Sequence, residues 1–182
     1  MAYLQKLKLF KQYFAREDGS TAIEFSMLCI PFITVMLAII EISVMYASAT
    51  LLEGATNSAA RLVRTGQVQK AGGDAEEMFR DALCGYTTVL VNCNDVQIEV
   101  VTMDSFASFD SYSASFDEDG NLVSQGFDAG GSEDRVLIRA VYRYRMMTPF
   151  IGQLLVGDDG EQLFISTIVL QTEPYEFQGD ET

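Results

Sequence analysis

The chain has 182 residues, a formal net charge of −14, no histidine and three cysteines. This length allows one domain with an anchor and is too short for two sizeable hydrophobic cores. The surplus of acid argues against nucleic-acid binding, since neutralising phosphates requires clustered Lys and Arg. The lack of histidine excludes catalysis that depends on imidazole.

Charge is distributed unevenly along the chain. Before Gly19, four basic residues outnumber two acidic ones, whereas after Glu41 eight basic residues face 22 acidic ones. By the positive-inside rule, the basic flank of a membrane span stays in the cytoplasm. We therefore expect residues 1–19 to form a basic cytoplasmic leader and the acidic part to lie outside the membrane.

Residues 25–52 form an apolar run whose only charged residue is Glu41. The run exceeds the roughly 20 residues that a helix needs to cross the hydrocarbon core of a bilayer. Its apolar residues surround the helix instead of forming one stripe, which is typical of lipid surroundings. The sequence predicts one transmembrane helix, with Pro31 near its beginning. A secretory signal peptide fits less well, because the run is too long and no small-residue cleavage site closes it.

Two carboxylates, Glu24 and Glu41, lie near the ends of this run. Their separation along a helix is about 25 Å, so both can lie at headgroup level, where a charge costs little. We interpret Glu41 as an acid that faces the headgroups of the far interface. Cys29, within the span, is interpreted as a small apolar residue.

The helix is expected to continue beyond the membrane, over residues 21–65. Gly66 is a typical helix end, and Arg61 and Arg64 complement the dipole of the last turn. A shorter span followed by a loosely packed helix is the alternative. Small residues four apart would allow a second helix to approach closely; they are Gly54 with Ser58 and Ala55 with Ala59.

The remaining residues predict a small exterior domain. A short amphipathic helix is expected from Asp74 to about Cys84. Alternating or continuous apolar patterns predict strands at 96–101, 135–145 and 163–171, the last suited to the centre of a sheet. Residues 104–134 are interpreted as a surface loop or weak hairpin. The predicted fold class is α+β: a long N-terminal transmembrane helix followed by a domain with a short helix and an antiparallel sheet.

Cys84 and Cys93 bracket a short loop after the predicted short helix. A disulfide between them would stabilise the domain by roughly 2.5 to 3 kcal/mol through loop entropy, and it would suit an oxidising compartment. Two buried thiols are the alternative.

No pattern typical of catalysis was found, and we expect neither an enzyme nor a metal or cofactor site. The sequence lacks a phosphate loop and cysteines with zinc spacing. Acidic clusters at 117–121 and 157–161 could hold calcium but lack the twelve-residue loop pattern, so we interpret them as ordinary turns. Aromatic residues between Phe106 and Phe127 are expected to fold back onto the core, a partner surface being the alternative.

The segment around Gly19 resembles a prepilin-peptidase site, because Glu24 is the fifth residue after the glycine. The stretch from Gly19 through Pro31, Glu41 and "AARLVRTG" (59–66) is similar to the TadE-like family, minor pseudopilins of the tight-adherence (Tad) pilus machinery. "VLIRAVYRYRMMTPF" and "STIVLQTEPYEF" extend the resemblance more sparsely. Phe25 stands where many Tad major pilins have tyrosine.

The resemblance implies cleavage between Gly19 and Ser20 by a prepilin peptidase. The carboxylate of Glu24 would then pair with the terminal amine of a neighbouring subunit and set the axial register. The parts of the chain would be a leader (1–19), an N-terminal helix with the span (20–66) and a periplasmic globular domain (67–182).

The function implied is that of a minor pseudopilin needed to initiate or cap a Tad/Flp-type type IV pilus used in surface attachment. The protein would lie in the bacterial inner membrane, with its N-terminus cytoplasmic, and would enter the fibre or stay at its base. Expected partners are other minor pseudopilins, the major pilin, the inner-membrane assembly platform and the lipid bilayer. An uncleaved single-span receptor or adhesin with a periplasmic binding domain is the alternative.

Overall fold

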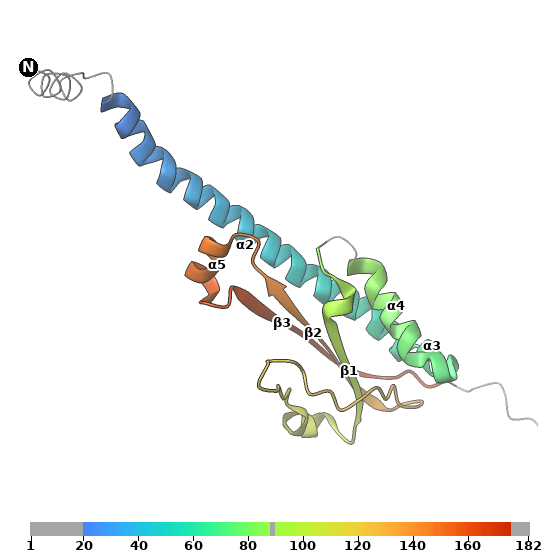
Figure 1. Cartoon of the computed structure of the whole chain (residues 1–182). Helices are drawn as coiled ribbons and strands as arrows, with labels where there is room; N and C mark the ends of the chain where they lie inside the picture. Colours follow the sequence, from blue (N-terminus) through green and yellow to red (C-terminus); the bar gives the residue numbers. More distant parts are fainter. Residues whose placement is uncertain (1–19, 88–89, 176–182) are drawn as a thin grey trace, which may run out of the picture.

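The computed structural model describes residues 20–87 and 90–175. Helix α2 (Ser20–Arg64) is the longest element; in Figure 1 its first half stands alone and its second half lies along a small domain. The other elements are α3 (Gln67–Lys70), η2 (Gly72–Asp74), α4 (Ala75–Thr87), η3 (Cys93–Asp95), β1 (Val96–Met103), η4 (Phe106–Tyr112), β2 (Arg135–Arg145), α5 (Pro149–Val156) and β3 (Glu161–Gln171). This is the predicted α+β class.

The three strands form one antiparallel sheet in the order β1-β2-β3. Val96 pairs with Tyr142 between β1 and β2, and Tyr142 pairs with Phe164 between β2 and β3. The expectation that 163–171 lies at the centre of the sheet was wrong: β2 is central and β3 is an edge strand. The apolar run of β3 misled because one face packs on the core through Phe164 while Ile165, on the other face, is 46% exposed.

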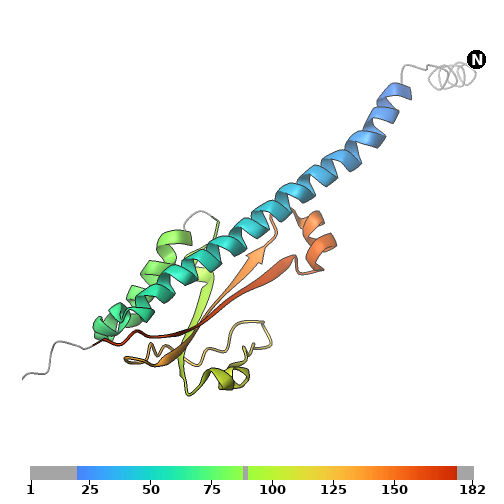
Figure 2. The same cartoon turned by 180° about the vertical axis from the view of Figure 1, so that it is seen from behind.

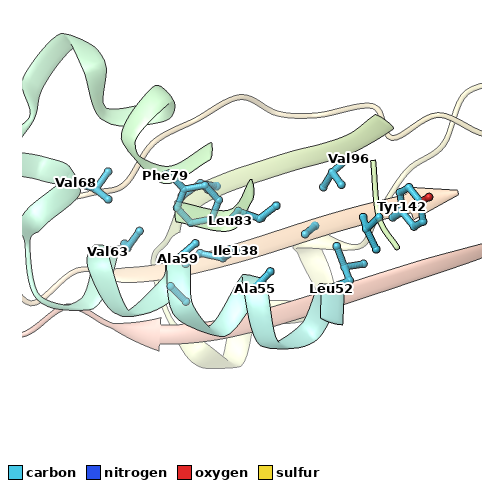
Figure 3. Packing of buried hydrophobic residues seen from close by; sticks show 14 of the residues in the cluster. Leu52, Ala55, Ala59, Val63, Val68, Phe79, Leu83, Val96, Ile138 and Tyr142 are labelled. Atoms are coloured by element: carbon cyan, nitrogen blue, oxygen red, sulfur yellow. The ribbon is translucent and has the colours of Figure 1, made fainter. Parts of the chain in front are cut away.

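The main core lies between the second half of α2, helix α4 and one face of the sheet (Figure 3). Ala55 and Ala59 of α2 are fully buried, and their small side chains let the backbone of α2 lie close to Phe79 of α4 and Ile138 of β2. The predicted close approach of a second helix thus occurs within the chain. The other pair considered does not take part in the same way: Ser58 is half-buried, and Gly54 is exposed, with open space where a Cβ would lie.

Residues 104–134 cover part of the opposite face of the sheet, where Tyr112 packs against the cluster of Val101, Met103 and Leu137. Arg139 of β2 forms an ion pair with Glu99 of β1, and the two side chains are 3% and 2% exposed. Arg139 also donates to the Tyr112 carbonyl (2.6 Å), and Glu99 accepts from the Gln125 backbone N–H (2.9 Å). The ion pair therefore fastens this segment to the sheet at two points, Tyr112 and Gln125, since each buried charge needs such partners.

The expected weak hairpin is present within this segment, where Phe116 pairs with Leu122. The expectation that its aromatic residues fold back holds only in part. Phe127 packs edge-on against Phe79, with ring centroids 5.6 Å apart, whereas Phe106 and Phe109 are 51% and 43% exposed. Phe106 lies under the guanidinium of Arg135, 5.8 Å from its carbon, in a cation–π contact.

Helix α2 ends at Arg64, two residues before Gly66, the predicted stop. Gly66 has a φ of 72° and donates its N–H to the Val63 carbonyl, an arrangement that closes helices and favours glycine. A Cβ on Gly66 would lie 2.6 Å from the ring of Tyr175, and Glu173 donates to the Arg64 carbonyl (2.8 Å). The segment after β3 therefore packs across the end of α2, as Figure 2 shows from behind.

Candidate membrane anchor and its docking to the domain

The first half of α2 is bare and apolar. Twelve large hydrophobic side chains from Ile23 to Ile40 are at least 42% exposed, and α2 is long and apolar enough to cross a bilayer. The hydroxyls in this stretch bond within the helix: Thr34 donates to the Ile30 carbonyl (2.9 Å) and Ser26 to the Ile23 carbonyl (2.9 Å). Such bonds satisfy polar groups that hydrocarbon cannot solvate.

The residues predicted for cleavage and register lie at the start of this helix. Gly19, with the rest of the leader, lies outside the described residues, and Ser20 is the first residue of α2. Glu24 follows about one turn later, on the exposed surface of the helix. Cleavage after Gly19 and pairing of Glu24 with a neighbouring subunit stay predictions.

Glu41 lies directly after the bare stretch, and its side chain is buried, with 2% of the residue exposed. One carboxylate oxygen accepts from the Met147 N–H (2.8 Å) and the Tyr144 hydroxyl (3.3 Å). The other accepts from the Thr148 N–H (3.1 Å) and the Thr148 hydroxyl (2.9 Å). The interpretation of Glu41 as an acid facing headgroups was wrong, because four donors from a segment over 100 residues away surround it. We call this arrangement the Glu41 clasp.

The clasp joins α2 to the start of α5, because Thr148 is the N-cap of α5 and Pro149 its first residue. A carboxylate is favoured there, since the N-terminal backbone N–H groups of a helix carry partial positive charge. Burial and, secondarily, the nearby carboxylate of Glu41 raise the pKa of Tyr144 to about 12. Its hydroxyl therefore remains protonated, and a donor, at neutral pH.

The sequence reasoning missed α5 and hence the donors of the clasp. Helix α5 has eight residues, and its apolar side chains show no polar face from which a helical period could be read. The available signal was local: Thr148-Pro149 has the N-cap and first-turn proline typical of a helix start, and Gly157 follows the end.

The structure contains the disulfide predicted between Cys84 and Cys93, with Cα atoms 5.5 Å apart. Cys84 lies in the last turns of α4, and Cys93 begins η3, directly before β1. The bond therefore links the helix layer to the first strand. Cys29, on α2, is half-buried and free.

The two acidic clusters form turns. The side chain of Asp117 accepts from the Asn121 backbone N–H (2.7 Å), which lowers the pKa of Asp117. Asp158 and Asp159 lie exposed in the turn before β3. Within residues 20–87 and 90–175, His, Cys, Asp and Glu side chains form no group of three suited to a metal ion.

These features define a class of protein: a long helix whose apolar first half can span a membrane, clasped to an α+β domain that packs on its second half. The family model of TadE-like proteins matches residues 19–61. This match confirms the resemblance to the TadE-like family and covers the anchor helix, less than half of the chain. No curated protein and no solved structure shows significant similarity to the chain.

Proposed function

We propose that this chain is a minor pseudopilin that initiates or caps assembly of a Tad/Flp-type pilus used in surface attachment. The TadE-like match is the observation that carries the proposal: it starts at Gly19, the residue after which a prepilin peptidase would cut, and includes Glu24 and Glu41. The family suggests a protein associated with the Tad pilus, and the initiating or capping role is our inference.

The arrangement of α2 supports this proposal. A pilin-type subunit needs a helix that is stored in lipid before assembly and packs among other helices afterwards. The bare apolar half of α2 suits both surroundings, since apolar side chains gain from either lipid or helix packing. The second half is already packed against the domain, so the domain would be carried into place with the helix.

We propose that the protein lies in a bacterial inner membrane with residues 1–19 in the cytoplasm and residues 67–182 in the periplasm. The basic leader supports this orientation through the positive-inside rule. The disulfide between Cys84 and Cys93 supports an oxidising compartment for the domain. The proposed partners are the prepilin peptidase, other minor pseudopilins, the major pilin and the inner-membrane assembly platform.

N-terminal processing tests the proposal. In cells with an active Tad prepilin peptidase, the mature protein should begin at Ser20, and Gly19→Val should accumulate full-length protein that is still inserted in the membrane. Glycine has no Cβ, whereas valine adds a branched side chain that a protease cleft shaped around glycine would exclude by steric clash. N-terminal sequencing and mass analysis of membrane fractions measure the result.

Uncut residues 1–19 in the wild-type chain would contradict the pseudopilin and favour the receptor or adhesin, whose leader is retained. Ala22→Val is the matched control, because it places the same side chain inside α2 and beyond the proposed cut. Sheared pili, probed for the chain by mass spectrometry, would then show whether the processed protein enters the fibre or stays at its base.

A further inference from the structure

Helix α5 exposes an apolar surface that the domain does not cover. Ile151 and Gly152 face inward and are buried, and Gly152 packs on Met146. Apart from Gln153, the large outward residues here are apolar, which is unusual for a helix in contact with water. We call them the α5 patch: Met147 (65% exposed), Phe150 (64%), Leu154 (67%) and Leu155 (45%).

The position of the α5 patch relative to α2 indicates what covers it. The bare stretch of α2 from Ile23 to Ile40 is about 26 Å long at 1.5 Å per residue, close to the ~30 Å thickness of the hydrocarbon core. Glu41 follows at once, and its carboxylate binds Met147 and Thr148 at the start of α5. The α5 patch therefore begins at the level where the exposed apolar surface of α2 ends.

Both views of the molecule place α5 at the end of the domain nearest the bare half of α2 (Figures 1 and 2). A bilayer that surrounds the bare half would meet α5 before any other part of the domain. The α5 patch thus adds apolar surface beside the membrane span of α2.

We propose that the α5 patch inserts into the leaflet on the domain's side of the membrane, so that α5 is an interfacial helix that supports the domain on the bilayer. The inference rests on the proposed function only in placing α2 across a membrane. The Glu41 clasp holds α5 against α2, and the two helices together fix the height of the domain above the lipid.

The contact is apolar and not electrostatic. Asp158 and Asp159 follow shortly after α5 and are exposed. Their charge would repel anionic headgroups, whereas helices that bind membranes electrostatically carry basic residues. Insertion should therefore occur in zwitterionic lipid and be insensitive to salt.

The experiment uses the absence of tryptophan from the chain. The full chain carrying Phe150→Trp is reconstituted at low protein-to-lipid ratio in phosphatidylcholine vesicles, some with acyl chains brominated near the headgroup. Phe109→Trp is the matched control, because Phe109 is an exposed aromatic residue on η4, away from α5 (Figure 1). Each variant then has a single tryptophan, which can be excited selectively at wavelengths that tyrosine does not absorb.

We expect blue-shifted emission and strong quenching by the brominated lipid for Phe150→Trp. Phe109→Trp should give emission typical of water and quenching by aqueous acrylamide. Equal acrylamide quenching of the two variants would overturn the inference. So would blue-shifted emission without quenching by brominated lipid, because this would mean that protein, such as a second copy of the chain, covers the patch.

An alkaline carbonate wash followed by flotation separates this inference from the proposed function. Chain retained in the vesicles with Phe150→Trp exposed to water would overturn the interfacial helix alone. Chain released by the wash would overturn both the membrane anchor and the inference.

Discussion

At the scale of single residues, Glu41 marks the point where α2 changes from a bare helix into a packed one. Ile40, before it, is 53% exposed, and Ser48 and Leu52, two and three turns later, are buried. A carboxylate at this boundary is buried only because four donors satisfy it. Without them the desolvation of its charge would oppose docking.

Glu41→Gln should weaken the clasp strongly. All four groups around the carboxylate are donors. In glutamine the amide oxygen can still accept from two of them, but the amide nitrogen, itself a donor, would face the other two. The negative charge is also lost. Hydrogen bonds to charged groups contribute about 1.5 to 3 kcal/mol each, and we expect the free energy of unfolding in detergent to fall by at least about 2 kcal/mol. Denaturant unfolding and amide exchange of α5 measure the loss.

Tyr144→Phe is the control for this prediction, because it removes only the longest bond of the clasp, at 3.3 Å. It should cost less than about 1 kcal/mol. An unfolding free energy for Glu41→Gln equal to that of the wild type would show that the carboxylate is not needed to dock α5.

At the scale of elements, the domain depends on links between segments that are short on their own. Helix α4 has 13 residues, a length that is marginal without tertiary contacts. Phe79 and Leu83 bury one face of α4 against α2 and the sheet, and the disulfide fixes the end of α4 to the start of β1. The apolar packing therefore holds one face of α4, and the disulfide holds its C-terminal end.

Replacing both cysteines, Cys84→Ser with Cys93→Ser, should lower the free energy of unfolding by roughly 2.5 to 3 kcal/mol, since the bond closes a short loop in the unfolded chain. Denaturant titration of the double variant against the oxidised protein measures this difference. Cys29→Ser tests the same chemical change outside the domain and should leave the midpoint unchanged. A double variant as stable as the oxidised protein would contradict the role given to the bond.

At the scale of the whole molecule, α2 serves two environments in succession. Its second half belongs to the core, whereas its first half presents side chains to whatever surrounds it. In the proposed pilus, the first half of α2 is surrounded by a bundle of neighbouring helices. A carboxylate in such apolar surroundings requires a partner. In this proposal Glu24 pairs with a neighbouring subunit.

Glu24→Ala should leave a membrane-inserted protein and sharply reduce the number of pili, because the helix keeps its apolar span but loses the charge that sets register. Pili are counted by electron microscopy, and insertion is checked by carbonate extraction. Ser26→Ala is the control: Ser26 is exposed on the same helix, and its hydroxyl bonds only within α2. Normal piliation in Glu24→Ala would reject the pairing role.

Patterns local in sequence predicted much of this molecule. The apolar run of residues 25–52 predicted the long helix, and the alternation in 135–145 predicted a strand. The spacing of Cys84 and Cys93 predicted a bond that short loops allow. These features can be predicted from the sequence because they depend on the length of an apolar run, on periodicity and on the spacing of nearby residues.

Tertiary structure decided which partner each buried group has. Alternation predicted the strand that carries Arg139, but only the folding of residues 104–134 onto the sheet buried Arg139 with Glu99. An apolar run predicted β3, yet its place at the edge of the sheet depends on strand pairing. The local surroundings of Glu41 predict a headgroup acid, whereas its donors come from Tyr144 to Thr148. A sequence pattern shows that a residue is apolar or charged, but the contacts that satisfy it are made by segments far away along the chain, and only the fold brings them together.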